Sequence, residues 1–439
     1  MQKLRRPHII GKAVRDMTRR VAAWMLLVLL MIPLLTSCAK NDNAELPPEA
    51  EGRTVITVGV WLDYGTLQRD LDEFNESQDE VWAVLKSYLQ PGDDGDAEAS
   101  IQRMYADLAT NNRPDLYYMV SYDAAAMRKG GYIADWYPLM EADPEFHKED
   151  YQTNIWEQLE TDGCLYQLCA SFNLYGMEAP GLDPGRTGWT LEEFDGWMNA
   201  NDLTVGRELL LKMMLWYGTQ FEYIDLENKT CQFETPAFYD WLAYLQSLPS
   251  DDSWDQPIGA RRIYGPHNHE YHHRVDGYYP RVAGLPSQNR TGPGIDVSDS
   301  YALSSDTKHP EACWAFARWQ LSYEWQNELM DGIPIRRDVW ESQLYRAGLD
   351  GDNEESLFHG YANPQEYGKP YPAMPEEEIE YLRESVANAS YVALGSLEYS
   401  DVTAIVEEEV LAYLAGDKTA EDCAHIIQSR VSTMLAEQE

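Results

Sequence analysis

Residues 164–177 read C-L-Y-Q-L-C-A-S-F-N-L-Y-G-M, an unusually long run of β-like sequence. A run of this length exceeds an ordinary strand, which has about 3–10 residues. We interpret it as a strand that leaves one lobe of the protein and enters a second, with a hinge near Ala170-Ser171. The segment therefore predicts a chain that is built as two lobes.

Strands and helices alternate ahead of that segment. Apolar runs predict strands over 54–61, 81–89 and 114–120, and apolar residues at helical spacing predict helices over 67–78 and 97–110. Strands that alternate with helices form right-handed βαβ units and a mostly parallel sheet. Further along, Thr190 and Glu193 have the spacing of a capping box and predict the start of another helix.

Length and composition favour a folded, acidic protein of two lobes. The chain has 439 residues, which is too many for one core and suits two. Hydrophobic residues make up 44% of it, which is ample material for both cores. Its formal net charge is −40. Such a charge repels nucleic acid and anionic lipid headgroups, so neither is an expected partner.

The first residues are typical of an export signal. Arg19 and Arg20 precede an apolar run that ends at Leu35, and the run of about 15 residues is short for a membrane span. The sequence L-T-S-C at 35–38 resembles the lipobox of bacterial lipoproteins, in which the cysteine receives a diacylglycerol and becomes the new N-terminus. We expect a signal peptide over 1–37 that starts at Met1 or Met17, a lipid on Cys38 and a flexible tether over 38–53.

The remaining cysteines do not suggest a disulfide framework. They are odd in number, and they form neither a CxxC pair nor a Cys/His zinc spacing. We predict that most of them are buried thiols: Cys164, Cys169, Cys231, Cys313 and Cys423.

Several later stretches resemble the extracellular solute-binding proteins of ABC transporters, the family that includes maltose-binding protein. They are L-A-T-N-N-R-P-D-L at 108–116, G-G-Y-I-A-D-W-Y-P-L at 130–139, G-L-P at 284–286, Y-A-L-S-S at 301–305, K-H-P-E-A-C-W-A-F at 308–316, and the C-terminal helix pair from 405 to 421. The resemblance spans most of residues 54–437. It departs at 264–279 and in the acidic, Pro-rich stretch 351–378.

The resemblance implies a two-lobed α/β fold, each lobe a mostly parallel sheet flanked by helices, with a hinge between them. The first lobe would hold 54–170 with about 302–325, and the second 171–301 with about 326–439. It further implies a monomer without cofactor on the outer face of the cell membrane, which captures a solute by hinge closure and delivers it to an ABC permease. The chain has no G-x-x-x-x-G-K-[ST] phosphate loop, so we expect the ATPase to be a separate chain.

Carbohydrate is the expected solute, and an oligosaccharide is slightly favoured over a monosaccharide. Sugars need aromatic faces and planar polar groups, and ligands of α/β sheets bind beyond the carboxyl ends of the strands. That position, the hinge and the returning strand together suggest eight binding residues: Trp61, Asp63, Tyr64, Ser121, Asp123, Phe172, Asn173 and Tyr301. A peptide, a polyamine or another small polar solute is the first alternative.

The alternative from another class is a surface lipoprotein hydrolase, either a glycosidase or a protease. His269-Glu270-Tyr271-His272-His273 satisfies H-E-x-x-H, which can hold zinc on a helix. The motif lies in a His-rich patch over 267–273, in which a chance match to H-E-x-x-H is easy. We interpret the segment as a polar loop or short helix without a metal. The acidic run at 93–98 lacks the spacing of an EF-hand loop, and nothing selects a catalytic carboxylate pair.

Overall fold

The structure of the protein is a computed structural model. It describes residues 46–61, 65–90, 97–110, 112–119, 124–179, 181–182, 188–216, 218, 222–225, 229–253, 256–329, 331–360, 369–391 and 397–437. The chain separates into two units, Met1–Gly52 and Arg53–Glu439. Of the first unit the described part contains one short 3₁₀ turn, η1 (Pro48–Ala50), and everything below concerns the second unit.

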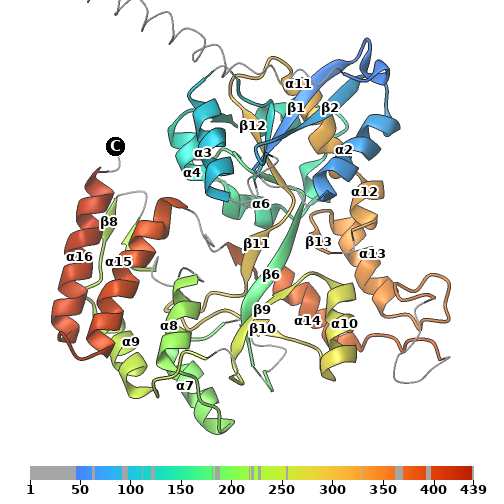
Figure 1. The fold of residues 1–439 in the computed structure, drawn as a ribbon. Coiled ribbons are helices and arrows are strands. Elements are labelled where there is room, and N and C mark those ends of the chain that lie inside the picture. The colour runs from blue at the N-terminus through green and yellow to red at the C-terminus, as the bar shows by residue number, and fades with distance from the viewer. Residues whose placement is uncertain are drawn as a thin grey trace, which may run out of the picture. The chain divides into compact units, whose positions relative to one another are not determined.

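The first sheet has the strand order β2-β1-β3-β12-β4, with β5 also paired to β12. Figure 1 labels its strands β1, β2 and β12. Its strands are β1 (Thr54–Val60), β2 (Val81–Ser87), β3 (Leu116–Tyr118), β4 (Ile133–Ala134), β5 (Leu168–Cys169) and β12 (Ser300–Ser304). The helices of this part are α2 (Thr66–Ser77), α3 (Ala97–Leu108), α4 (Ala124–Lys129), α5 (Tyr137–Ala142), η2 (Lys148–Asp150), α6 (Thr153–Leu159), α11 (Pro310–Gln320) and α12 (Tyr323–Asn327). Ile56, Val58 and Val60 are fully buried on β1, as the apolar run predicts.

The second sheet is built around β6 and has the order β10-β6-β11-β14, with β9 and β13 also paired to β6. Its strands are β6 (Ser171–Glu178), β9 (Gly259–Ile263), β10 (Val282–Ala283), β11 (Gly294–Val297), β13 (Ile333–Pro334) and β14 (Ser390–Tyr391). The remaining elements are α7 (Leu191–Ala200), α8 (Arg207–Trp216), the hairpin β7 (Ile224–Asp225) and β8 (Thr230–Cys231), α9 (Pro236–Ser247), α10 (Pro266–Asp276), α13 (Arg337–Ala347), α14 (Glu376–Ala387), α15 (Leu397–Leu414) and α16 (Ala420–Glu437).

Both sheets are mixed, which corrects the expectation of mostly parallel sheets. In the first sheet β1 pairs in parallel with β2 and β3, but β12 pairs antiparallel with β3, β4 and β5. In the second sheet β9, β10, β11 and β13 all run antiparallel to β6, whereas β11 and β14 are parallel. The physical reason is that the chain passes from the first sheet to the second and then returns. The strands on the way back, β11 and β12, are therefore antiparallel to β6 and to β3, respectively.

The chain crosses between the sheets at Ala170, where the long β-like segment predicts a crossing. β5 ends at Cys169 in the first sheet and β6 begins at Ser171 in the second. The chain returns at Ser298-Asp299, between β11 and β12, and crosses a third time between α11 and β13. Gln326 of α12 ties the third crossing to the first, because its amide nitrogen donates to the Ala170 carbonyl oxygen at 2.8 Å.

One hydrophobic core joins the two sheets. It includes Ile56 and Leu116 from the first sheet and Leu174 and Ile333 from the second. A separate core lies under α7, α8, α9, α15 and α16, and the paired helices α15 and α16 appear in red in Figure 1.

Within the described residues the five cysteines after Cys38 are free thiols, four of them buried and Cys164 half-buried. This confirms the expectation of mostly buried thiols. Among the helices that the structure describes, none is both long and apolar enough to span a bilayer.

Candidate functional site

A polar group of side chains shares one face of the second sheet. The strand register places Asp296 opposite Asn173, and Arg262 opposite Tyr175. Partners in an antiparallel pair point to the same side, and so do alternate residues along a strand. Asn173, Tyr175, Arg262 and Asp296 therefore lie on one face, which we call the polar face. The opposite face carries Leu174 and Ile263, both in the shared core.

Arg262 and Asp296 form an ion pair on the polar face. The Arg262 Nε lies 2.5 Å from Asp296 Oδ2, and the guanidinium carbon lies 5.4 Å from the centre of the Tyr175 ring. Burial raises the pKa of the Asp296 carboxyl, and the charge of Arg262 acts against that rise. The Arg262 side chain is 48% exposed, so a guanidinium that is already held in place faces outward.

Asn173 has a carbonyl oxygen without a hydrogen-bond partner among the described residues. Its amide nitrogen donates to Ser298 Oγ at 2.6 Å, but its Oδ1 is buried and accepts no hydrogen bond. A buried polar atom in that state costs about 1–3 kcal/mol. An oxygen of this kind suits a hydroxyl or N–H group of a bound molecule, which would remove the cost.

Asp299 holds the first two crossings together. Its carboxylate accepts hydrogen bonds from Ser171 Oγ at 2.6 Å and from the Tyr118 hydroxyl at 2.9 Å. Its backbone oxygen accepts from the Ala170 N–H at 2.7 Å. Burial raises the pKa of the Asp299 carboxyl, and the Ser171 and Tyr118 donors act against that rise. Tyr118 on β3 is thereby linked to the start of β6.

A second buried acid, Asp70 of α2, lies near this junction. It is 3% exposed, and burial, followed by repulsion from Asp299, raises its pKa to about 6. The Gln320 amide nitrogen lies 3.4 Å from Asp70 Oδ2 and donates to the Tyr301 hydroxyl at 2.9 Å. The junction between the sheets thus holds buried acids and amides beside the apolar side chains of the shared core.

The structure places the eight predicted binding residues in different surroundings. Asn173 belongs to the polar face, and Trp61 is half-buried against a small cluster that includes Met104 and Leu108. Phe172 and Tyr301 have exposures of 0% and 1%, and their rings fill the shared core in this structure. The other four lie outside the described residues: Asp63, Tyr64, Ser121 and Asp123. Cys38, the predicted lipidation residue, also lies outside them.

Sequence reasoning missed Tyr118, Tyr175, Arg262, Asp296 and Asp299. Tyr175 could have been found, because it stands two residues after Asn173 on the same predicted strand and must share its face. Arg262 and Asp296 could not have been found in this way. The strand register determines which residues of distant strands lie opposite Asn173 and Tyr175. That register is set by the tertiary structure.

The H-E-x-x-H motif lies on α10, where its two outer histidines meet different partners. His269 is fully buried and its Nε2 lies 3.1 Å from Glu378 Oε2. His273 stacks on Tyr279 at 4.1 Å between ring centres. The Glu270 carboxylate accepts hydrogen bonds from Tyr279 and Arg274. In the part of the chain described here, no group of three or more His, Cys, Asp or Glu side chains could hold a metal ion.

No protein-family model matches the chain, and no curated protein matches its sequence. Solved structures do match. An extracellular solute-binding protein of family 1 from Alicyclobacillus acidocaldarius has 13% identity and a TM-score of 0.58 over 87% of this chain and 98% of its own. The sugar-binding protein MalE of Xanthomonas citri has 12% identity and a TM-score of 0.61 over 88% and 98%. An oligosaccharide-binding protein of Synechococcus, described as putative, has 12% identity and a TM-score of 0.60 over 87% and 99%. The chain therefore has the two-lobed α/β fold of the extracellular solute-binding proteins.

Proposed function

We propose that this chain captures a carbohydrate between its two lobes and delivers it to the permease of an ABC importer, without acting as an enzyme. The observation that carries the proposal is the polar face next to the crossings. There the orphaned Oδ1 of Asn173 and the exposed guanidinium of Arg262 offer one acceptor and several donors within one sheet. Planar polar groups of this kind pair with the adjacent hydroxyls of a sugar ring.

We further propose that the first lobe supplies the aromatic part of the site. Trp61 directly follows the carboxyl end of β1. Asp63 and Tyr64 come next in the sequence. Ser121 and Asp123 stand in the same relation to β3. Tyr118 at the end of β3 is already linked to Asp299 and Ser171 at the crossing, which supports a site between the two lobes.

A thermal-shift screen tests the class of solute. We expect at least one neutral oligosaccharide to raise the melting temperature, because a ligand at 100 times its dissociation constant stabilises the folded state by about 2.7 kcal/mol. If only a polyamine or a peptide raises it, the carbohydrate assignment is wrong. If an oligosaccharide is cleaved during the incubation, the hydrolase alternative holds.

Calorimetric titration of matched variants tests the site. Arg262→Ala and Asn173→Ala should each weaken binding of the oligosaccharide that the screen finds by about tenfold or more, since each removes a polar partner of a buried ligand. Arg261→Ala is the control, because Arg261 is the neighbour of Arg262 on β9 and faces the opposite side of the sheet. Equal losses in all three variants would place the ligand elsewhere.

We also propose that a lipid on Cys38 holds the protein at the membrane. The L-T-S-C sequence at 35–38 supports this, and an anchored receptor would stay close to its permease. A Cys38→Ala variant should bind the solute as well as the parent protein but be released from cells. Retention of that variant in the washed membrane fraction would show that the lipobox interpretation is wrong.

A further inference from the structure

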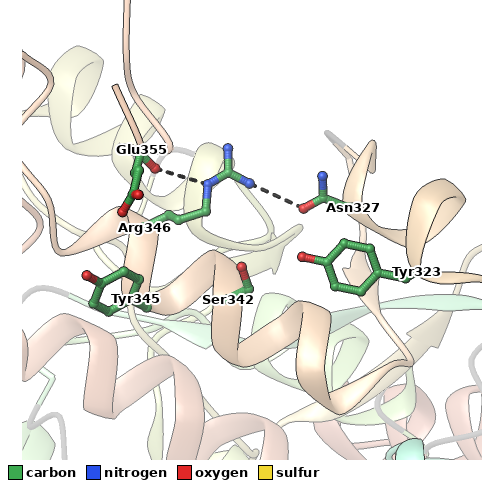
Figure 2. A pocket seen from close by; sticks show the side chains of 6 residues that line it. All are labelled: Tyr323, Asn327, Ser342, Tyr345, Arg346 and Glu355. Atoms are coloured by element: carbon green, nitrogen blue, oxygen red, sulfur yellow. Dashed lines mark hydrogen bonds between the residues drawn. The ribbon is translucent and has the colours of Figure 1, made fainter. Parts of the chain in front are cut away.

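A pocket lies on the outer surface of α12 and α13. It measures about 440 Å³ and is lined by Tyr323, Asn327, Ser342, Tyr345, Arg346 and Glu355. Figure 2 shows the two tyrosines on opposite sides of Ser342, with Arg346 extended above it. None of these six residues belongs to the polar face, and Tyr323 and Asn327 lie on α12, in the segment of the third crossing. We propose that this pocket is a separate binding site for a neutral sugar unit of a larger glycan.

The helix spacing explains why these residues meet at the surface. Ser342, Tyr345 and Arg346 stand at i, i+3 and i+4 on α13 and so share one side of that helix, while Tyr323 and Asn327 stand at i and i+4 on α12. The opposite side of α13 is buried, because Trp340 and Leu344 pack into the core, and on α12 Gln326 bonds to Ala170. The pocket therefore lies on the side of α13 that faces away from the core.

The two tyrosine rings are unusually open. Tyr345 is 63% exposed and Tyr323 is 42% exposed, whereas most aromatic side chains of the described residues are buried. Ser342 lies between them and leaves room because its side chain is small. Exposed rings that border a hollow provide flat surfaces for the C–H faces of a sugar, and their hydroxyls lie at the polar end of each ring.

Arg346 is held in a fixed orientation within the pocket. Its Nε donates to the Glu355 backbone oxygen at 3.1 Å, and its Nη1 donates to Asn327 Oδ1 at 3.2 Å. These bonds fix the guanidinium plane and use two of its five N–H donors. The other donors, the Asn327 amide nitrogen and the Ser342 hydroxyl are the polar groups that a ligand would meet.

The charges in the pocket favour an uncharged ligand. The pocket lining holds one cation, Arg346, and one acid, Glu355, and the protein as a whole carries −40. The negative net charge of the protein would repel a phosphate or a carboxylate. An apolar molecule would leave the polar groups of Arg346, Asn327 and Ser342 without hydrogen-bond partners from the ligand. A neutral ring with several hydroxyl groups can pair with donors and with the Glu355 carboxylate at the same time.

Native affinity electrophoresis tests the proposal with the full chain. The protein is run in gels that contain one soluble neutral polysaccharide each: amylopectin, glycogen, laminarin, mannan, galactomannan or arabinoxylan. We expect at least one of them to retard the parent protein relative to a gel without polysaccharide. The Tyr323→Ala/Tyr345→Ala variant and the Arg346→Ala variant should lose at least about tenfold in affinity, because each loses an anchor of the contact.

Two matched variants separate this site from the others. Tyr271→Ala removes a tyrosine that is 56% exposed on α10, outside the pocket, and should be retarded like the parent. Asn173→Ala alters only the polar face and should also be retarded, which separates this proposal from the proposed function. Circular dichroism spectra equal to that of the parent establish that the pocket variants are folded. No retardation of the parent in any gel, or full retardation of the double tyrosine variant, would overturn the proposal.

Discussion

Asp70 shows how one residue near the crossings limits stability at neutral pH. Its carboxyl group is buried on α2, and both burial and the neighbouring Asp299 disfavour its charged form. The pKa therefore rises from about 3.8 in the unfolded chain to about 6 in the folded protein. Because the folded state binds the proton more tightly, the stabilisation from this group is fully present below pH 3.8 and is lost as the pH rises through 6.

An Asp70→Asn variant should remove this dependence. At pH 7.5 we expect the variant to be more stable than the parent by up to about 3 kcal/mol, since each unit of pKa shift corresponds to about 1.4 kcal/mol. At pH 4 the two proteins should unfold at nearly the same urea concentration. Asp72→Asn, an exposed position on the same helix, is the control. An equal gain at both pH values would mean that the effect of Asp70→Asn is not due to ionisation.

At the scale of elements, α10 and α14 are joined by a buried polar network. Glu378 on α14 contacts His269 of α10 and Arg281, which precedes β10. Hydrogen bonds and charge from His269 and Arg281 hold the pKa of Glu378 below its usual range, against the effect of burial, and burial lowers the pKa of His269. The histidine that the H-E-x-x-H pattern would assign to zinc is thus a structural partner of Glu378.

Removing the carboxylate should destabilise the protein. Glu378→Ala leaves Arg281 without its buried partner and His269 without its acceptor, and such losses cost about 3–5 kcal/mol. The control is Glu377→Ala, because Glu377 is 70% exposed and lies 3.9 Å from the same Arg281 nitrogen. Urea unfolding at pH 7 measures both. If the two variants lose similar free energy, the network does not join the helices as described. Zinc and EDTA should leave the melting temperature of the parent unchanged.

At the scale of the whole molecule, the shared core implies that the two sheets unfold together. Ile56 on β1 and Leu174 on β6 belong to one continuous set of buried side chains, and Asp299 and Gln326 tie the crossings. Unfolding of either sheet would expose apolar side chains of the other. Partial unfolding should therefore cost nearly as much free energy as global unfolding.

Hydrogen exchange in increasing urea tests this expectation. The amides of β1 and β6 should exchange with the same free energy and the same dependence on urea, as expected for one cooperative unit. The helices α15 and α16 lie over the separate core and serve as the internal comparison. If β1 exchanges at a lower free energy than β6, with a weaker dependence on urea, the first sheet opens independently and the shared core does not couple the lobes.

The sequence by itself determined those features of the protein that depend on neighbouring residues. The capping box of α7 is present as expected, with the Glu193 N–H donating to Thr190 Oγ1 and the Thr190 N–H to the Glu193 carboxylate. The strand and helix order up to β3, the crossing at Ala170 and the burial of most cysteines also follow from local pattern and segment length. Local backbone preference and hydrophobic periodicity act within a few residues, which is why a single sequence reveals them.

Only the tertiary structure decided which distant residues meet. Nothing near Asn173 in the sequence predicts that Arg262 and Asp296 lie beside it, because strand register is fixed by packing across the whole sheet. The same reason explains why the second sheet is mostly antiparallel and why Tyr301 lies in the core. It also explains the outer pocket, since α12 and α13 each carry an ordinary polar side, and only their packing brings Tyr323, Ser342 and Tyr345 around one hollow.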